Sequence, residues 1–235
     1  MEYKNGISEA TMRRLPIYVH LLRSYDENKV ENISCSDIGR HLNFDPTQVR
    51  KDLEATGIIG KPRVGFHVPS LILAIEDFLG WNNVNDAFLA GAGNLGAALL
   101  GYERLKRYGV HIVAAFDSDP AKIGREIYSH PVLSIDRMTN LAKRMHILIG
   151  IITVPGEHAQ KTAEMMVEGG IRAIWNFSPV SLSLPGHIIV QNEELYYSLA
   201  ALSRKLADHI NQPNLSDGVS KDGSNPNAAD PVAKI

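Results

Sequence analysis

The chain has 235 residues, with 24 Lys or Arg, 26 Asp or Glu and 44% apolar residues. This length allows one or two domains, and the composition is that of a folded globular protein, which excludes wholesale disorder. The single cysteine, Cys35, excludes an intramolecular disulfide framework and an all-cysteine zinc site, and the net charge of −2 gives no sign of a nucleic-acid partner.

Helix signals come first along the chain. After a flexible N-terminus at residues 1–7, the apolar residues within 8–23 predict a helix that Pro16 bends or divides. The Ser-Cys-Ser-Asp run at 34–37 is typical of a capping box, in which a side-chain oxygen accepts a hydrogen bond from a first-turn N–H. It predicts a short helix through residue 42.

The next predicted helix has the pattern of a DNA-recognition helix. Asp45 can accept hydrogen bonds from the free first-turn N–H groups, so the helix should begin there and end at Gly57. Val49 and Leu53 are one turn apart and should face the core. The side chains left exposed are Thr47, Gln48, Arg50 and Lys51. They have the types that bind guanine, adenine and phosphate, although a solvated face or a surface for another protein helix has the same pattern.

Two short extended runs around a Gly/Pro turn follow within residues 58–68. Three helices and such a hairpin predict a winged helix-turn-helix. Lys61 and Arg63 lie at the tip of the predicted wing, where basic side chains can enter a minor groove. A linking helix over 70–79 would complete a DNA-binding domain of residues 8–79.

From residue 80 onwards the pattern changes to alternating strands and helices. Continuous apolar runs predict strands at 87–90, 112–116, 147–154, 173–175 and 188–190. A helix is expected from about residue 94 to 107 and another over 157–167. Continuous apolar strands separated by helices are typical of a parallel, doubly wound sheet, so residues 80–190 are predicted to form an α/β domain of the Rossmann type.

A glycine loop of the dinucleotide-binding type follows the first of these strands. Its residues are Gly91, Ala92, Gly93, Asn94, Leu95 and Gly96. The three glycines would allow a tight turn, close approach of a pyrophosphate, and close packing of helix on strand. Asp117 ends the next strand and can bind ribose hydroxyls, and it would repel a 2′-phosphate, which favours NAD(H) over NADP(H). A glycine turn that binds nothing is the alternative.

Two further loops follow later strands, at the edge where such sheets bind ligands. They contain Thr153 and Val154, and Asn176, Phe177 and Ser178. A mildly apolar surface with a few amide and hydroxyl groups suits a nicotinamide ring, although ordinary strand-ending turns have the same composition.

Catalytic patterns are weak in this chain. A Tyr-x-x-x-Lys spacing occurs at Tyr25/Lys29 and at Tyr102/Lys106, but the second pair is placed on the helix just after the glycine loop, whereas dehydrogenase chemistry needs it in a later helix. The length leaves no room for a substrate domain, and no histidine pair has metal-binding spacing. We expect no enzyme and no metal. The alternatives are a single-domain NAD-dependent oxidoreductase with an appended winged helix, and a CoA-binding regulatory module.

The C-terminal part begins with a predicted helix over 193–210. It repeats Leu195, Leu199, Leu202, Leu206 and Ile210 at alternating spacings of four and three, as a helix–helix seam does. We therefore assign a C-terminal helix to residues 191–211 and a disordered tail to 212–235. The apolar run at 86–102 is too short and too rich in glycine to span a membrane, and the N-terminus lacks a leader pattern, so the cytoplasm is the expected compartment.

Six motifs occur in a familiar order. They are Gln48–Leu53, Val64-Gly65-Phe66, Gly91–Gly96, Phe116–Pro120, Thr153–Pro155 and Asn176–Pro179. Together they resemble the bacterial Rex family of redox-sensing transcriptional repressors over residues 8–211. The resemblance implies a homodimer that binds palindromic double-stranded operator DNA and releases it when NADH binds, whereas NAD⁺ competes without releasing it. It also implies a C-terminal helix that is exchanged between subunits.

The resemblance carries roles to single residues as well. The glycine loop would hold the diphosphate, and residues 153–154 and 176–178 would lie by the nicotinamide. Tyr102 matches a family tyrosine involved in redox sensing. His20 stands where an arginine is common, and Glu194, followed by Leu195, stands where Asp and an aromatic residue are common. We expect Tyr102, His20 and the Glu194 of the partner chain to form the signalling group.

Overall fold

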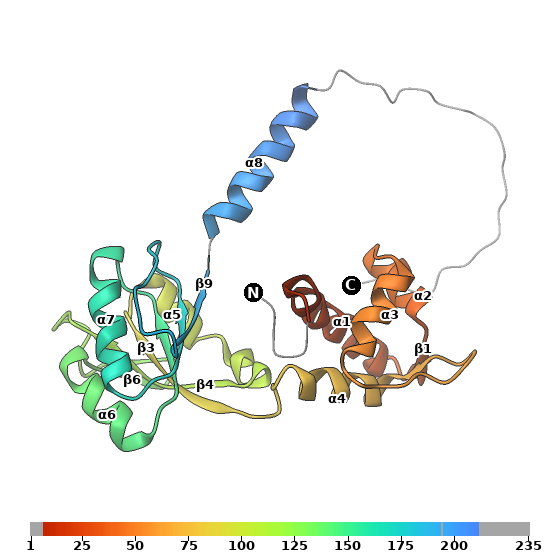
Figure 1. Ribbon diagram of the computed structural model, residues 1–235. Coiled ribbons are helices and arrows are strands. Elements are labelled where there is room, and N and C mark those ends of the chain that lie inside the picture. The colour runs from red at the N-terminus through yellow and green to blue at the C-terminus, as the bar shows by residue number, and fades with distance from the viewer. Residues whose placement is uncertain (1–6, 194, 212–235) are drawn as a thin grey trace. The chain divides into compact units, whose positions relative to one another are not determined.

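The computed structural model describes residues 7–193 and 195–211. The chain divides into two compact units at Glu193/Glu194. The first unit contains a helical N-terminal region and a seven-stranded sheet, and the described part of the second is the helix α8 (Leu195–Asn211) (Figure 1). Residues 1–6 of the predicted flexible N-terminus at 1–7, and the whole of the predicted disordered tail at 212–235, lie outside the described residues. No described helix is both long and apolar enough to cross a bilayer.

The helical region has the predicted helices. They are α1 (Glu9–Glu27), α2 (Cys35–Leu42), α3 (Pro46–Glu54) and α4 (Val68–Phe78). α1 is one helix with Pro16 inside it, so the chain is not divided there. The predicted capping box is present, since Ser34 Oγ accepts the Asp37 N–H at 3.1 Å and Asp37 Oδ2 accepts the Ser34 N–H at 3.3 Å.

The wing differs from the predicted hairpin. Strand β2 (Phe66–His67) pairs antiparallel with β1 (Asn32–Ile33), which precedes α2, and the 61–65 turn holds a single bridge between Lys61 and Gly65. The expectation of two paired runs within 58–68 was therefore wrong. Gly65 has φ +93° and lies so close to β1 that an added Cβ would be 2.3 Å from the Ile33 carbonyl oxygen. This close contact selects β1 as the partner, while Ile59 is left 91% exposed.

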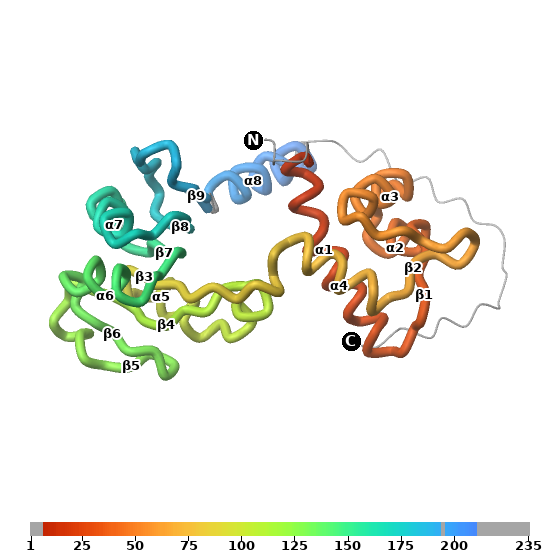
Figure 2. The backbone as a smooth tube through the Cα atoms, turned by 60° about the horizontal axis from the view of Figure 1, so that its bottom comes forward, coloured from red at the N-terminus to blue at the C-terminus, as the bar shows by residue number. Residues whose placement is uncertain are grey.

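The sheet has the strand order of a Rossmann fold. Its strands are β3 (Asn85–Ala90), β4 (Val110–Asp117), β5 (Glu126–Ile127), β6 (His130–Ser134), β7 (Ile149–Ile152), β8 (Ala173–Asn176) and β9 (Ile189–Asn192). They lie in the order β5-β6-β4-β3-β7-β8-β9, parallel except for the β5–β6 hairpin (Figure 2). The order reverses at β3 and β7, which is where such sheets bind ligands. The predicted fold class is confirmed, and the hairpin at the edge was not predicted.

The helices of the sheet region are α5 (Asn94–Leu100), α6 (Met138–Met145) and α7 (Gly156–Glu168), with short 3₁₀ turns η1 (Glu103–Tyr108) and η2 (Ile135–Arg137). The helix expected to reach residue 107 ends at Leu100. Gly101 caps α5 in a position where an added Cβ would be 2.8 Å from the Tyr128 ring. Tyr102 therefore lies in the connection between α5 and η1, and its placement on the helix was wrong.

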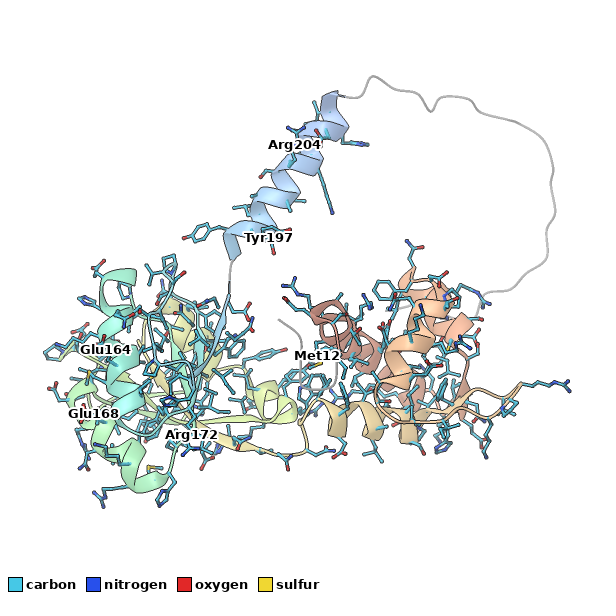
Figure 3. The ribbon with its side chains drawn as sticks, in the orientation of Figure 1. Met12, Glu164, Glu168, Arg172, Tyr197 and Arg204 are labelled. Carbon is cyan, nitrogen blue, oxygen red and sulfur yellow. The ribbon has the colours of Figure 1, made fainter. Side chains whose placement is uncertain are left out.

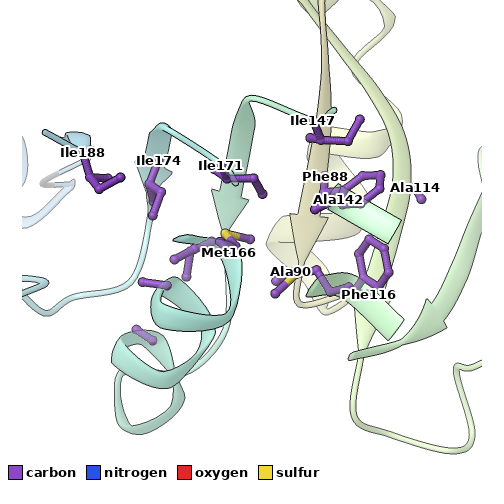
Figure 4. Packing of buried hydrophobic residues seen from close by; sticks show 14 residues of the cluster. Phe88, Ala90, Ala114, Phe116, Ala142, Ile147, Met166, Ile171, Ile174 and Ile188 are labelled. Carbon is purple, nitrogen blue, oxygen red and sulfur yellow. The ribbon is translucent and has the colours of Figure 1, made fainter. Parts of the chain in front are cut away.

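Both faces of the sheet are buried, which explains the continuous apolar strands. Successive residues of β3 alternate between two cores, because side chains of a strand point to opposite faces. Phe88 and Ala90 pack with Phe116, Met166 and their neighbours on one face (Figure 4). Ala87 and Leu89 belong to a separate cluster on the other. Burying one such large side chain stabilises the fold by about 1.5–3 kcal/mol, so the carboxyl ends of β3 and β7 are held rigidly.

Candidate functional site

The three glycines of the loop after β3 have different surroundings. Gly91 has φ +102°, and an added Cβ there would be 2.8 Å from the Thr153 carbonyl carbon. At Gly96 an added Cβ would be 2.0 Å from the Gly91 oxygen, whereas at Gly93 it would meet nothing within 4 Å. The first and third glycines therefore allow close packing, and the second leaves its backbone accessible. This is the division of roles that a diphosphate-binding loop requires.

Thr153 fastens this loop to the end of β7. Its hydroxyl donates to the carbonyl oxygens of Ala90 at 3.0 Å and Gly91 at 2.7 Å, and its N–H also donates to Ala90. The hydroxyl is thus used within the protein, and Thr153 acts on the loop rather than as a free polar group.

Asp117 at the end of β4 is 9% exposed and accepts three hydrogen bonds. Oδ2 accepts the Ala92 N–H at 2.8 Å and the Lys122 ammonium at 3.0 Å, and Oδ1 accepts the Asp119 N–H at 2.9 Å. Burial alone would raise the pKa of Asp117, but these donors outweigh it and lower that pKa below its usual value. The carboxylate is therefore ionised at neutral pH.

Lys122 is a residue that sequence reasoning missed. It lies in the turn after Asp119-Pro120, where Asp119 Oδ1 accepts the Ala121 N–H at 2.9 Å. A carboxylate offers about four acceptor positions, and three of those of Asp117 are in use. One position remains for a ribose hydroxyl, and Lys122 has further N–H donors for a neighbouring hydroxyl oxygen. The sequence signal was a lysine one turn after the strand-ending aspartate.

A pocket of about 800 Å³ opens beside these residues. Of the predicted nucleotide residues, its lining contains Gly91, Gly93, Asp117, Thr153 and Val154. It also contains Lys122 and, from α7, His158, Lys161, Thr162 and Met165, none of which was predicted. The lining does not include Ala92, Asn94, Leu95, Gly96, Asn176, Phe177 or Ser178. The volume suits a nucleotide, since ligand pockets are commonly about 300–1,000 Å³.

The loop after β8 uses its polar groups internally. Asn176 is fully buried, and its Nδ2 donates to Val180 O and to Asn192 Oδ1, each at 2.9 Å. Its Oδ1 accepts the Ser178 N–H at 3.0 Å, and the Ser178 hydroxyl donates to Val154 O at 2.6 Å. These bonds define the shape of the loop. A contact of residues 176–178 with nicotinamide stays a prediction.

The predicted signalling residues are accessible where they are described. Tyr102 is 46% exposed, and His20 is exposed on α1. Glu194 lies outside the described residues. Their joint role stays a prediction.

The predicted DNA-facing residues of α3 and the wing are exposed with one exception. Thr47, Arg50, Lys51, Lys61 and Arg63 are all exposed, and the nearest approach of Arg50 Nε to Glu54 Oε1 is 3.7 Å. Gln48 is partly buried, and its Nε2 donates to Asp52 Oδ1 at 3.0 Å. This bond uses one of the two Nε2 N–H groups of Gln48 and leaves the other N–H and Oε1 for a base.

Asp52 is the centre of a buried cluster that was not predicted. It is 1% exposed and accepts hydrogen bonds from Thr11 at 3.0 Å, Tyr18 at 2.7 Å, Gln48, and both Arg14 Nε at 2.6 Å and Nη2 at 2.8 Å. Burial alone would raise the pKa of Asp52, but these donors lower it, while burial and the nearby carboxylate raise the pKa of Tyr18. The cluster fixes α3 against α1.

A metal centre finds no support in the described part of the chain. Among residues 7–193 and 195–211, no three His, Cys, Asp or Glu side chains gather closely enough to hold a metal ion.

Two family models match the chain in separate regions. One, described as a putative DNA-binding protein N-terminus, matches residues 6–54, which include α1 to α3. The other, described as a CoA binding domain, matches residues 82–180, which include β3 to β8.

Similar proteins cover nearly the whole chain. The redox-sensing transcriptional repressor Rex of Treponema denticola is 47% identical over 192 residues, covering 82% of this chain and 91% of the relative. That of Bacteroides thetaiotaomicron is 40% identical over 200 residues, covering 85% and 91%. The crystal structure of RSP, a Rex-family repressor, in complex with β-NAD⁺ and operator DNA has a TM-score of 0.82 at 32% identity, and covers 87% of this chain and 94% of that chain. RSP in complex with β-NADH gives 0.78 at 32% identity, with coverage of 87% and 96%.

Proposed function

This chain belongs to the Rex family of redox-sensing transcriptional repressors, and we propose that it binds palindromic operator DNA as a homodimer and releases it when NADH occupies the pocket beside β3, β4 and β7. The resemblance inferred from the six motifs is confirmed by the similar proteins, which are Rex repressors. The relatives are repressors, so the prediction that the chain is not an enzyme is also confirmed. The cytoplasm stays the predicted compartment, since it is where bacterial DNA is found.

The observation that supports nucleotide binding best is the accessible Gly93 between two crowded glycines, next to the ionised Asp117. Residues 91–96 would hold the diphosphate, and Asp117 and Lys122 the adenosine ribose. Val154 and residues 176–178 would lie at the nicotinamide end. When bound, NADH supplies an uncharged dihydronicotinamide, whereas NAD⁺ supplies a cationic ring. A nucleotide can shift the equilibrium between the DNA-binding and the DNA-releasing state only if it binds one state more tightly than the other.

The DNA-facing surface is proposed to be α3 with the wing. Arg50 would contact a base edge, Lys51 a phosphate, and Lys61 and Arg63 the minor groove beside the wing. The Asp52 cluster supports this assignment, because it holds α3 in one orientation and leaves its basic residues exposed. The domain boundaries at 8–79, 80–190 and 191–211 are part of the same proposal, with α8 as the helix that pairs two subunits. Its Leu199, Leu202, Leu206 and Ile210 are exposed in the single chain.

A mobility shift at fixed salt tests this function. The full-length protein is incubated with a library of palindromic DNA, bound sequences are recovered, and the complex is titrated with NADH or NAD⁺. Salt must be fixed because phosphate contacts make DNA affinity strongly dependent on it. We expect NADH to release the DNA and NAD⁺ to shift the NADH titration without releasing it. Equal DNA binding with both nucleotides at saturation would contradict the proposal.

Coenzyme A is a second candidate ligand because of the match to the CoA binding domain over residues 82–180. It shares an adenosine diphosphate moiety with NADH but carries a phosphate on its ribose, which the ionised Asp117 would repel. We therefore expect CoA to compete weakly with NADH. Displacement of NADH by an equal concentration of CoA would favour this candidate instead.

A further inference from the structure

Glu193 follows β9 and is the last described residue before α8. It forms two hydrogen bonds with β8. The Trp175 indole Nε1–H donates to Glu193 Oε1 at 2.7 Å, and the Glu193 N–H donates to Asn176 O at 2.8 Å. β8 and β9 are parallel with Trp175 opposite Gln191. Because alternate residues of a strand share a face, Trp175, Gln191 and Glu193 project to the same side of the sheet.

The same residues contact the loop predicted to lie at the nicotinamide end. The Trp175 ring centroid is 4.6 Å from that of Phe177. Asn176, which shapes this loop through Ser178, also donates to Asn192 Oδ1 at 2.9 Å. The end of β8 is thus joined to the end of β9 by side-chain and backbone bonds together.

β9 is the edge strand, with β8 as its one neighbour in the sheet. Val190 packs against the core, but Ile189, Gln191 and Asn192 are exposed, so the carboxyl end of this strand is held mainly by its bonds to β8. Trp175 and Glu193 are partly buried, and a hydrogen bond to an ionised carboxylate is stronger than one between neutral groups. The indole–carboxylate bond therefore fixes the end of β9 together with the backbone bonds to β8 and the bond between Asn176 and Asn192.

We propose that Trp175 and Glu193 form a positioning pair that couples the nucleotide pocket to the segment carrying α8. A nucleotide that moves the 176–178 loop would move Trp175 with it, and Trp175 would move Glu193. Glu194, a predicted signalling residue, is next in the sequence, followed by α8. This inference rests on the proposed NADH-dependent release of DNA. In it the pair does not bind the nucleotide but couples nucleotide binding to the position of the segment that carries α8.

The test compares two quantities for each variant of the full-length protein. One is the Kd for NADH in the absence of DNA, and the other is the NADH concentration that releases half of the operator DNA recovered from the library. Trp175→Phe keeps an aromatic ring but removes the donor, and Glu193→Ala removes the acceptor. We expect each to raise the half-release concentration about tenfold, within the usual range of coupling between sites, and to leave the Kd for NADH within about twofold.

Conservative and combined variants separate coupling from general damage. Glu193→Gln keeps an amide oxygen that can accept the indole N–H, so it should retain most of the wild-type response. Trp175→Phe combined with Glu193→Ala should be no worse than either alone, because one bond is lost in each case. Glu168 of α7, labelled in Figure 3, forms an exposed ion pair with Lys143 of α6. Glu168→Ala breaks this pair, is the matched control and should behave as wild type. If Trp175→Phe does not fold, Glu193→Ala and Glu193→Gln carry the test.

The outcomes distinguish a failure of the proposed function from a failure of the coupling role of the pair. If wild type is not released by NADH, the proposed function fails. If wild type is released and Glu193→Ala is released at the same concentration, or if Glu193→Gln is as impaired as Glu193→Ala, the proposed function stands and the coupling role of the pair is wrong.

Discussion

The helical N-terminal region and the sheet region each contain a buried aspartate, and the two carboxylates differ in how fully they are satisfied. Asp52 accepts five hydrogen bonds, so all of the roughly four acceptor positions of its carboxylate are in use. Asp117 accepts three and lines a pocket. A saturated carboxylate can only hold elements together, whereas one with a free acceptor position at a pocket can bind a ligand. Asp52 therefore fixes the shape of the first region, whereas Asp117 can take part in ligand binding in the second.

Replacing Asp52 should have the largest effect. Asp52→Ala leaves the Arg14 guanidinium without its partner, and breaking a buried ion pair costs about 3–5 kcal/mol. We expect urea unfolding of the helical region at a lower midpoint and loss of operator binding, with NADH affinity unchanged. Asp26→Ala, on the exposed side of α1, is the control and should leave the urea midpoint and operator binding unchanged. A matching loss of NADH affinity in Asp52→Ala would mean that the two regions are not independent in stability.

Replacing Asp117 should act on recognition instead. Asp117→Asn keeps the size of the side chain but removes the charge and one acceptor oxygen, and hydrogen bonds to charged groups contribute about 1.5–3 kcal/mol. We expect the Kd for NADH to rise about 30-fold, measured by calorimetry, and the preference for NADH over NADPH to narrow. The urea midpoint should change less than in Asp52→Ala. The opposite ranking of the two variants in stability would overturn the comparison.

Much of both regions could be predicted from the sequence because the signals are local. The capping box at Ser34, the helix start at Asp45, the glycine loop and the strand-ending Asp117 each depend on residues within a few positions of one another. Asp52 was missed because its partners Thr11, Arg14 and Tyr18 are on another helix, more than thirty positions away. From the sequence alone, an aspartate beside Leu53 looks the same as an aspartate on the exposed face of the helix.

Other differences also come from tertiary contacts. The wing pairs with β1 because Gly65 fits against Ile33, which no local pattern in residues 58–68 shows. α5 ends early at Gly101, where the Tyr128 ring from the β5–β6 hairpin occupies the adjacent space. The bond between Trp175 and Glu193 depends on the register of β8 and β9. Sequence reasoning gave the type of most elements it predicted but missed β5, β6 and α6, and only the structure could give these partners.

Acid should weaken the Asp52 cluster by a smaller amount than its removal. The pKa of Asp52 is lowered in the folded state, so its stabilisation is fully present above the unfolded value of about 3.9 and is lost as the pH falls through the folded value. We expect the free energy of unfolding to fall by at most about 1.4 kcal/mol per pH unit for this group. Urea midpoints measured between pH 3 and pH 7 should fall less steeply for Asp52→Asn than for wild type, and equal slopes would contradict this assignment.

Lys122 offers the smallest and most specific test. Its side chain is about one-third exposed, so its bond to Asp117 is partly screened by solvent and contributes little to stability. Lys122→Ala should therefore leave the urea midpoint unchanged while raising the Kd for NADH about three- to fivefold, because a donor to the ribose is lost. Binding of NADPH should weaken more than that of NADH, since the ionised Asp117 would then face a 2′-phosphate without its counter-ion. Lys143→Ala, an exposed lysine of α6, is the control. Equal losses for both nucleotides in Lys122→Ala would contradict the role of Lys122 as the counter-ion of Asp117.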